Sequence, residues 1–210
     1  MAEDDPDSGC HHCHQQNLPW DRFVRLGEYE DELRRVVLDI KFGGWRELGT
    51  EMGQLAARHL ANRLRLAGLS HLPVILVPIP MHFVRRMTRG IDHTAVICRG
   101  MARELQASVI PALRSRAWRH TQLDVAASRR EAHARASLAP GRWPGSSRLA
   151  VAVRNGGVVV VVDDVKTTGS TLAAAARIVR KTVRRETSRG YQTLMIWGLS
   201  LAVTQPGREG

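Results

Sequence analysis

The sequence is poor in cysteine, in lysine and in long apolar runs, and each shortage excludes a class of protein. Three cysteines in 210 residues are too few for a disulfide framework. No apolar run is long enough to span a bilayer, and the acidic N-terminus is unlike a signal peptide, so we expect a cytoplasmic protein without membrane contact. The length and the hydrophobic fraction of 43% predict one well-buried domain with a small appendage.

Positive charge is abundant although lysine is scarce. The formal net charge is +11, and lysine occurs only as Lys41, Lys166 and Lys181, so nearly all of the cations are arginines. Clustered cations bind polyanions by releasing counterions, which makes nucleic acid a candidate partner. Because the arginines are spread along the chain, with a dense stretch at 114–148, composition alone leaves this partner open.

The N-terminus contains a single CxxC pattern that is typical of half a zinc site. Cys10 and Cys13, together with His14, are ligand types that Zn²⁺ prefers. A closed structural site needs four ligands, and no second CxxC follows. Either neighbouring histidines complete the site or the pattern is a remnant.

Alternating strand and helix patterns predict an α/β fold with a mostly parallel twisted sheet and helices on both faces. Helical spacing of apolar residues indicates helices within 29–40, 48–64, 91–105 and 172–183. Short apolar runs indicate strands at 72–79, 108–111, 158–162 and 192–202. A turn at 154–157 between apolar residues 149–153 and 158–162 predicts a β-hairpin. We expect an irregular tail at 1–27, one domain at 28–205 and a short tail at 206–210, with irregular chain up to about residue 25.

The most informative stretch joins a strand to a helix through two acids and a hydroxyl-rich loop. Asp163 and Asp164 follow the apolar run 158–162, and Gly169 lies in the loop that enters the next helix. Such a loop can wrap N–H groups around a phosphate at a helix N-terminus, while the acids accept hydrogen bonds from hydroxyls. Helix capping alone explains one hydroxyl but not paired acids with four hydroxyls around a glycine. The pattern is no Walker loop, and one ligand that satisfies both halves is a sugar phosphate.

This arrangement resembles the motif by which type I phosphoribosyltransferases bind phosphoribosyl pyrophosphate (PRPP). The resemblance implies that Asp163 and Asp164 hold the ribose hydroxyls and position Mg²⁺. It also implies a 5′-phosphate site formed by Lys166, Thr167, Thr168, Gly169, Ser170 and Thr171.

A second basic loop follows the strand that ends at Pro80. It contains Arg85, Arg86 and Arg89, whose forked guanidinium groups suit phosphate oxygens. Such a segment more commonly forms a solvent-exposed basic loop without a ligand. Because PRPP requires a second anion site, these arginines are also candidates for binding its pyrophosphate.

Together these segments resemble the competence protein F family, bacterial proteins with a phosphoribosyltransferase-like fold that are linked to DNA uptake. The family has V-P-x-P followed by R-x-x-x-R-G-F-N-Q, and this chain has the corresponding residues at 77–80 and 85–93. Further matches are the helix end Ile40-Lys41-Phe42 and the segment from Thr121 to Arg130. The chain departs from the family at Ile91-Asp92-His93, where the family has F-N-Q, and in having one cysteine pair where the family has two.

The resemblance implies a flexible hood at 112–148 that covers an acceptor site, with Gln122, Arg129 and Arg130 as contacts. Two functions remain open. One is a phosphoribosyltransferase that binds PRPP with Mg²⁺ and transfers phosphoribosyl to an unidentified acceptor. The other is a non-catalytic module that binds a nucleotide or single-stranded DNA and assists DNA uptake with competence proteins. Purine salvage is disfavoured because Thr167 stands where salvage enzymes have an acidic general base.

Overall fold

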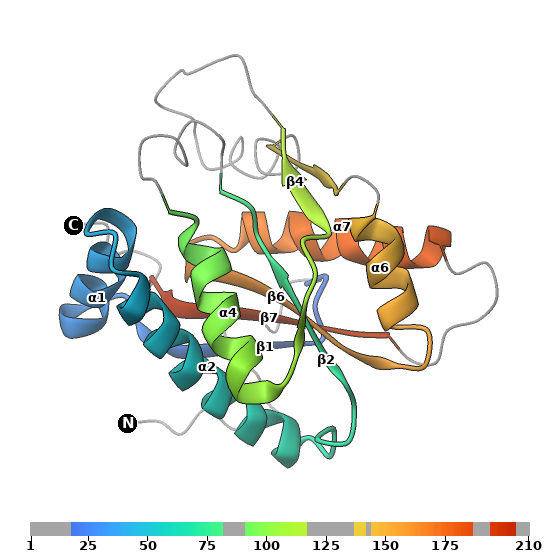
Figure 1. Ribbon diagram of the computed structural model, residues 1–210, viewed down its shortest axis with the longest axis horizontal. Helices are drawn as coiled ribbons and strands as arrows, with labels where there is room; N and C mark the ends of the chain where they lie inside the picture. The colour runs from blue at the N-terminus through green and yellow to red at the C-terminus, as the bar shows by residue number, and fades with distance from the viewer. Residues whose placement is uncertain (1–17, 82–90, 117–136, 142–143, 187–193, 205–210) are drawn as a thin grey trace.

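The structure is a computed structural model that describes residues 18–81, 91–116, 137–141, 144–186 and 194–204. Figure 1 labels its helices and strands. The strands are β1 (Arg22–Glu28), β2 (Val74–Pro78), β3 (Ser108–Val109), β4 (Leu113–Ser115), β5 (Leu138–Pro140), β6 (Gly157–Lys166) and β7 (Leu194–Val203). The helices are α1 (Asp31–Phe42), α2 (Arg46–Leu66), α4 (His93–Leu105), α6 (Gly145–Ala152) and α7 (Ser170–Glu186).

Five strands form one parallel sheet in the order β1-β7-β6-β2-β3. Strands β4 and β5 form a separate antiparallel pair. Helices cover both faces of the larger sheet (Figure 1). The predicted α/β fold is confirmed, and its architecture is consistent with that of the type I phosphoribosyltransferases.

The central strand β6 separates two hydrophobic cores. Val159 and Val161 contribute to the core that also contains residues of α6 and α7. Val158, Val160 and Val162 contribute to the core formed with α1, α2 and α4. Because successive side chains of a strand point to opposite faces, a strand covered on both sides becomes an uninterrupted apolar run.

The connections that leave β2 and β6 run to opposite faces of the sheet. Helix α4 follows β2 on the face of α1 and α2, whereas α7 follows β6 on the other face. The chain then continues outward in opposite directions, since β3 lies beside β2 and β7 lies beside β6. The carboxyl ends of β2 and β6 are therefore a topological switch point, where open parallel sheets usually bind ligands.

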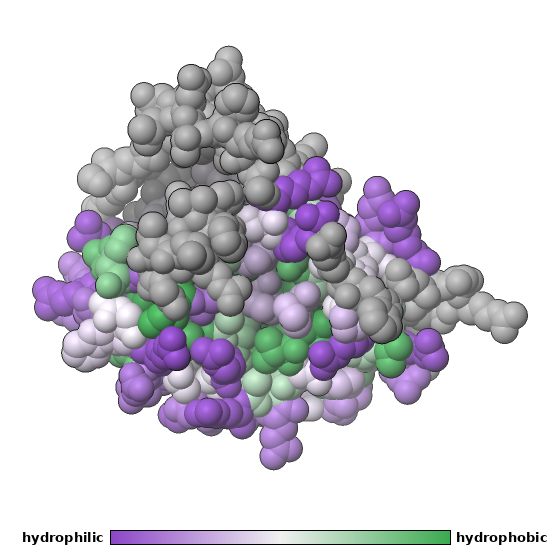
Figure 2. Space-filling model, turned by 45° about the horizontal axis from the view of Figure 1, so that its top comes forward, coloured by the Kyte–Doolittle hydropathy of each residue, from purple (hydrophilic) through white to green (hydrophobic). Residues whose placement is uncertain are grey.

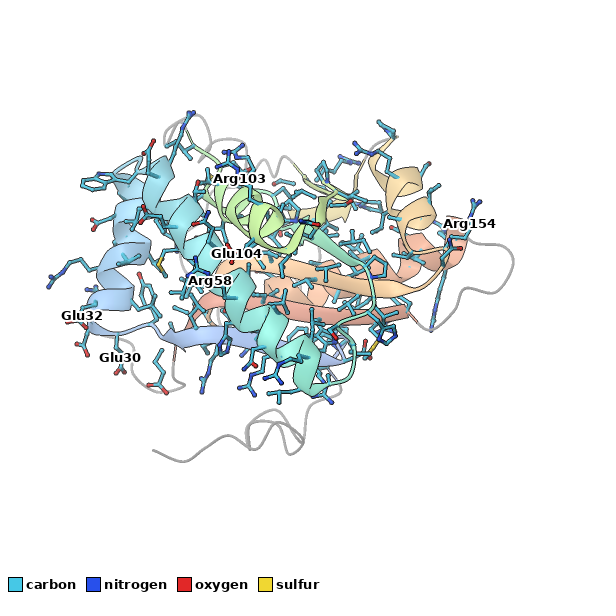
Figure 3. All side chains as sticks on the ribbon, turned by 60° about the horizontal axis from the view of Figure 1, so that its bottom comes forward. Glu30, Glu32, Arg58, Arg103, Glu104 and Arg154 are labelled. Carbon is cyan, nitrogen blue, oxygen red and sulfur yellow. The ribbon has the colours of Figure 1, made fainter. Side chains whose placement is uncertain are left out.

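Helices α2 and α4 approach each other closely through glycines. A Cβ atom on Gly53 would collide with the carbonyl oxygen of Ile97, and one on Gly100 would collide with that of Thr50. The pairing brings the beginnings of the two helices to the same end of the sheet. An exposed ion pair between Arg58 and Glu104 joins the helices on their outer side (Figure 3).

The surface is mixed in character. On the face that Figure 2 shows, hydrophobic residues form small separate patches between hydrophilic ones. Among the residues that the structure describes, no helix combines the length and apolar character needed to cross a membrane.

The predicted β-hairpin around residues 154–157 is wrong, because the residues before the turn are helical. Leu149, Ala150 and Val153 are buried while Val151 is 60% exposed, which is the periodicity of a helix packed on one side. The chain passes from α6 to β6 through Gly156 and Gly157, both with positive φ angles. Strand β6 then pairs in parallel with β2 and β7 rather than with the preceding segment.

The prediction of irregular chain up to about residue 25 is wrong for residues 22–25. They belong to the edge strand β1, which pairs with β7 from Arg22↔Trp197 to Glu28↔Val203. Trp20, just before the strand, is buried in the core beneath α7. Edge strands tolerate charged residues on their open side, which weakens the sequence pattern of the strand.

Candidate functional site

The two acids lie within β6 rather than after its end. The strand continues to Lys166 because β7 runs beside it, with Asp163 opposite Ser200 and Lys166 opposite Val203. On its other side β6 extends past β2, whose ladder with β6 ends at Pro78↔Val162. Both acids therefore occupy the part of β6 that projects beyond β2 at the switch point.

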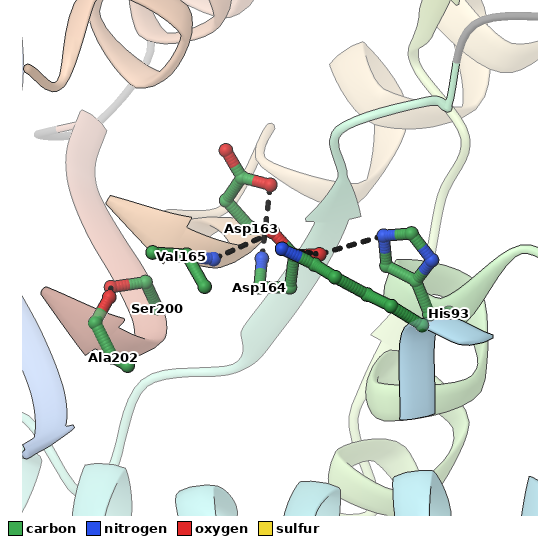
Figure 4. Close-up of polar contacts among 7 residues, drawn as sticks. His93, Asp163, Asp164, Val165, Ser200 and Ala202 are labelled. Carbon is green, nitrogen blue, oxygen red and sulfur yellow. Dashed lines mark hydrogen bonds and ion pairs between the residues drawn. The ribbon is translucent and has the colours of Figure 1, made fainter. Parts of the chain in front are cut away.

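The two carboxylates point to opposite faces of the sheet, as the alternation along β6 requires. Asp164 faces the helices α1 and α4, and its Oδ2 lies 2.7 Å from Nε2 of His93 and 3.1 Å from Nζ of Lys41. The backbone N–H of Val165 donates to its Oδ1 over 2.6 Å. Figure 4 shows Asp164 turned toward His93 and Asp163 turned away from it.

The cluster of Lys41, His93 and Asp164 joins three distant segments of the chain. Lys41 comes from the last turn of α1, His93 begins α4, and Asp164 lies in β6. His93 and Asp164 are both buried, and Asp92 caps α4 by accepting a hydrogen bond from the Ala95 N–H. The cluster thus fixes the beginning of α4 and the end of α1 against the projecting part of β6. Nδ1 of His93 is buried and has no hydrogen-bond partner within the described segments.

The neighbouring carboxyls have opposite pKa shifts. Burial raises the pKa of Asp163 to about 8, and the negative charge of Asp164 adds to this effect. Burial also acts to raise the pKa of Asp164, but the hydrogen bond from His93 and the charge of Lys41 outweigh it and lower the pKa to about 2. Asp164 is therefore the ionised, paired member, and Asp163 is the one that exchanges a proton near neutral pH.

The loop after β6 is shaped by Gly169 and by two hydroxyl groups. Gly169 is buried with φ +77°, a left-handed conformation that strains any residue with a Cβ. Its carbonyl accepts the first helical hydrogen bond of α7, from the Ala173 N–H. Thr168 Oγ1 and Ser170 Oγ lie 2.8 Å apart, and Thr168 is exposed. The hydroxyls, the glycine and the first turn of α7 form a compact group of hydrogen-bond donors suited to an anion.

The Lys166 side chain packs against this loop, because a Cβ atom on Gly169 would lie 3.0 Å from Cε of Lys166. Its Nζ lies 5.5 Å from the centre of the Phe23 ring, a cation–π contact. Thr167 is exposed, whereas Thr171 is half-buried at the beginning of α7. Among the residues predicted to bind the 5′-phosphate, the structure brings Lys166, Thr168, Gly169 and Ser170 together.

The residues predicted to hold Mg²⁺ differ in how well they fit a cation. Both oxygens of Asp164 are engaged, one by the Val165 N–H and the other by Lys41 and His93. Asp163 accepts the Asp164 N–H through Oδ1 and contacts neither Lys41 nor His93 in the ion pairs that hold Asp164. A carboxylate oxygen is a suitable ligand for Mg²⁺, so only Asp163 fits this role without breaking the cluster. No group of three or more acidic, histidine or cysteine side chains in the described ranges is arranged for metal binding.

Several predicted site residues lie outside the described residues. They are the pyrophosphate candidates Arg85, Arg86 and Arg89, the hood residues Gln122, Arg129 and Arg130, and the zinc candidates Cys10, Cys13 and His14. Their roles stay predictions.

Sequence reasoning did not predict that Lys41 and His93 meet at Asp164. Lys41 lies in the helix end Ile40-Lys41-Phe42, which matches the competence protein F family, whereas His93 lies where the chain departs from that family. Only the first position therefore carries a signal in the sequence. No local pattern indicates that side chains so far apart in sequence contact one carboxylate.

The chain is similar to proteins of DNA utilization and competence. It is 29% identical over 195 residues to the DNA utilization protein YhgH of Salmonella typhimurium, which covers 92% of this chain and 78% of that protein. It is 28% identical to YhgH of Escherichia coli K12 over 196 residues, covering 90% of this chain and 76% of the relative. It is 27% identical over 197 residues to competence protein F of Haemophilus influenzae, covering 92% of this chain and 78% of that protein. No family model matches the chain. These relatives confirm the predicted resemblance to the competence protein F family.

Proposed function

We propose that this protein is a nucleotide-binding module of DNA utilization, whose ligand lies at the carboxyl end of β6. The observation that carries the proposal is the combination of the half-buried Asp163 carboxyl with the donor-rich loop at Thr168 to Ser170. The first suits hydroxyls of a sugar, and the second suits a phosphate. The relatives named for DNA utilization and competence support the biological setting.

The cluster around Asp164 makes the pair of acids compatible with an anionic ligand. Two unpaired carboxylates would repel a phosphate, but Lys41 and His93 surround the charge of Asp164. Asp163 has a raised pKa and carries less negative charge near neutral pH. The site therefore presents one carboxyl that can gain or lose a proton near neutral pH, beside the anion-binding loop.

In this proposal Asp163 contacts the sugar and the loop contacts the phosphate. Oδ2 of Asp163 accepts a hydrogen bond from a sugar hydroxyl. The Thr168 and Ser170 hydroxyls donate to phosphate oxygens, and the first turn of α7 adds the positive end of its helix dipole. Gly169 takes the left-handed conformation that turns the loop into α7, with the Lys166 side chain packed against it. Asp164 acts as a positioning residue, since its own oxygens hold α1 and α4 in place.

A second candidate is PRPP with Mg²⁺, favoured by the same acid-and-loop arrangement. Asp163 would hold the cation, which would neutralise the pyrophosphate charge when bound. The chain's part in phosphoribosyl transfer would then be to immobilise the sugar between two anchored anions. Among the described residues, His93 is a histidine near the acids, but its Nε2 is already engaged by Asp164. This arrangement supports binding more directly than proton transfer to or from an acceptor.

Calorimetric titration of the full chain distinguishes these candidates. Adenosine monophosphate, thymidine monophosphate and PRPP are titrated separately, each with and without Mg²⁺. We expect micromolar binding (about −8 kcal/mol) of at least one of them. Binding of a monophosphate without Mg²⁺ supports the nucleotide module. Binding of PRPP, but of neither monophosphate, supports the second candidate.

The variant Asp163→Asn tests the site itself. Above about pH 8, where Asp163 is ionised, the loss of a charge-assisted hydrogen bond is expected to weaken binding about tenfold or more. Asp39→Asn, on the exposed side of α1, is the matched control because it removes one carboxylate charge at a distance from β6. Equal affinity of wild type and Asp163→Asn would refute the site, and no heat with any ligand would refute the function.

A further inference from the structure

A lysine and two aromatic rings lie together beside the loop that follows β6. Nζ of Lys166, the last residue of β6, lies 5.5 Å from the centre of the Phe23 ring on β1. The ring of Phe23 also meets that of Trp20, with 6.0 Å between their centroids and an interplanar angle of 43°. Because β7 lies between β1 and β6 in the sheet, this group connects the edge strand to the loop across a whole strand.

The Phe23 ring is fixed by neighbours on two sides. Gly198 is opposite Phe23 in β7, and a Cβ atom on this glycine would lie 2.8 Å from Cδ2 of the ring. The ring therefore lies directly over the backbone of β7 and leans toward β6. Trp20, which is buried, packs against it from the segment before β1. A ring held in this way offers an ammonium group one defined position, whereas a lysine in water loses the entropy of many rotamers when it is ordered.

The same group contacts the loop at its glycine. A Cβ atom on Gly169 would lie 3.0 Å from Cε of Lys166 and 3.4 Å from Cη2 of Trp20. Since Cε carries the ammonium group, the positive charge lies beside the loop in which the hydroxyls of Thr168 and Ser170 are 2.8 Å apart. The cation is therefore next to the hydrogen-bond donors that the proposed function assigns to a phosphate.

Lys166 differs from Lys41 in what surrounds its charge. Nζ of Lys41 lies 3.1 Å from Oδ2 of the ionised Asp164, and this carboxylate balances its charge. An aromatic face attracts a cation through its quadrupole but carries no net charge. The ring of Phe23 thus orders the Lys166 ammonium without neutralising it, and the cation keeps its attraction for an anionic ligand.

We propose that Phe23 is a positioning residue of the phosphate site, which holds the Lys166 ammonium beside the loop so that it contacts the phosphate of the nucleotide. This inference rests on the proposed function and deepens it, because it brings the edge strand β1 into the nucleotide site. Packing of the core accounts for the burial of Trp20, but it does not require a cation over the ring of Phe23.

Because lysine is scarce in the chain, NMR can observe this contact directly. Full-length protein labelled with ¹³C at the lysine Cε atoms gives signals from Lys41, Lys166 and Lys181, which are assigned by replacing each with arginine in turn. In the ligand-free protein, the ring current of Phe23 should shift the Hε signal of Lys166 upfield of that of the exposed Lys181. The shift should disappear in Phe23→Leu and persist in Phe23→Tyr, which retains the ring.

Calorimetric titration then measures what this position contributes to binding, with whichever of thymidine monophosphate, adenosine monophosphate and PRPP the wild type binds most tightly. Lys166→Met removes a charge-assisted contact and should weaken binding about tenfold or more. Phe23→Leu should weaken it about twofold to fivefold through the lost cation–π contact, and Phe23→Tyr should keep the wild-type affinity. Combining Phe23→Leu with Lys166→Met should cost no more than Lys166→Met alone, since Phe23 acts through the lysine.

Arg22→Gln is the matched control, because it removes another cation from an aromatic face on the same strand. Cζ of Arg22 lies 5.9 Å from the centre of the Trp197 ring, and this ring belongs to the core on the opposite face of the sheet from Phe23. The control should change neither the Lys166 signal nor the nucleotide affinity. Thermal melts followed by circular dichroism verify that each variant is folded, and Phe23→Met replaces Phe23→Leu if the leucine variant does not fold.

A Lys166 signal at the position of Lys181 would overturn the proposal, and so would wild-type affinity in Phe23→Leu. Losses that add up in the double variant would overturn it as well, because Phe23 would then act independently of the lysine. Each of these results leaves nucleotide binding by the wild type intact and refutes only the positioning role. Absence of binding of all three ligands to the wild type refutes the proposed function and this inference together.

Discussion

Nε2 of His93 donates a hydrogen bond to Oδ2 of Asp164 over 2.7 Å, and this contact anchors the beginning of α4 to the central strand of the sheet. Because Asp164 is buried and ionised, each donor that it loses leaves charge in a poorly solvated place. The contact therefore concerns the stability of the fold as well as the shape of the site.

His93→Leu should lower the free energy of unfolding by about 2 to 3 kcal/mol, because it leaves Asp164 with Lys41 as its remaining side-chain partner. His93→Gln should cost less than about 1.5 kcal/mol, since its amide N–H can donate to the same oxygen. Urea denaturation at neutral pH measures both. Equal losses in the two variants would show that packing rather than the hydrogen bond is responsible.

Asp163 makes the stability of the protein depend on pH. Its pKa is raised from 3.8 to about 8, so between these values the folded state keeps a proton that the unfolded chain has lost. Stability from this group is complete below the lower value and declines as the pH rises through the upper one. Asp163→Asn should therefore gain stability relative to wild type as the pH rises from about 4 to about 8.

Urea titrations across this pH range check the prediction, with Asp39→Asn as the control for removing a carboxylate charge. A constant difference between wild type and Asp163→Asn at every pH would contradict it. Below pH 4, both proteins should lose stability together, because the pKa of Asp164 is lowered and its protonation breaks the pairs with His93 and Lys41.

The contact between α2 and α4 should tolerate no added methyl group. Gly53→Ala and Gly100→Ala each place a Cβ against a backbone carbonyl of the facing helix, and backbone cannot move aside cheaply. The higher helix propensity of alanine recovers about 1 kcal/mol of this cost, yet we expect the free energy of unfolding to fall by about 2 kcal/mol or more. Thermal denaturation measures the loss, and a stabilised variant would show that the helices are not held this closely.

The ion pair of Arg58 and Glu104 on the same two helices should contribute little. The Arg58 side chain is 63% exposed, and exposed pairs usually contribute between zero and about 1 kcal/mol. Arg58→Ala should therefore change the free energy of unfolding by less than about 0.5 kcal/mol at physiological salt. A loss comparable to that of Gly53→Ala would mean that charge rather than close packing joins the helices.

Much of the sheet could be predicted from the sequence because its central strands are buried on both faces. The run of valines in β6 leaves little alternative to a buried strand, and the helical spacing of the residues after Gly169 identifies α7. Residues 149–153 show the limit of such patterns, since a short apolar run fits a strand and a buried helix equally well. Only the burial of Leu149 and Val153 on one side of α6 separates the two.

The candidate site could be predicted in part for a similar reason. The acids and Gly169 are contiguous in sequence, and therefore their motif is visible. The position of β7 beside β6 extends the strand through Asp163 and Asp164, a tertiary effect that local polarity hides. The convergence of Lys41 and His93 on Asp164 depends on how α1 and α4 pack, which no local spacing encodes.

Strand β1 has a consequence for synthesis on the ribosome. Its neighbour in the sheet is β7, the last strand that the structure describes, so the ladder cannot form until Trp197, the partner of Arg22, has been translated. At usual rates of elongation the delay is on the order of ten seconds or more. During that time β1 lacks its partner and can pair with other extended chains. The parallel sheet therefore reaches its final topology only after β7 has been synthesised, late in the growth of the chain that contains both strands.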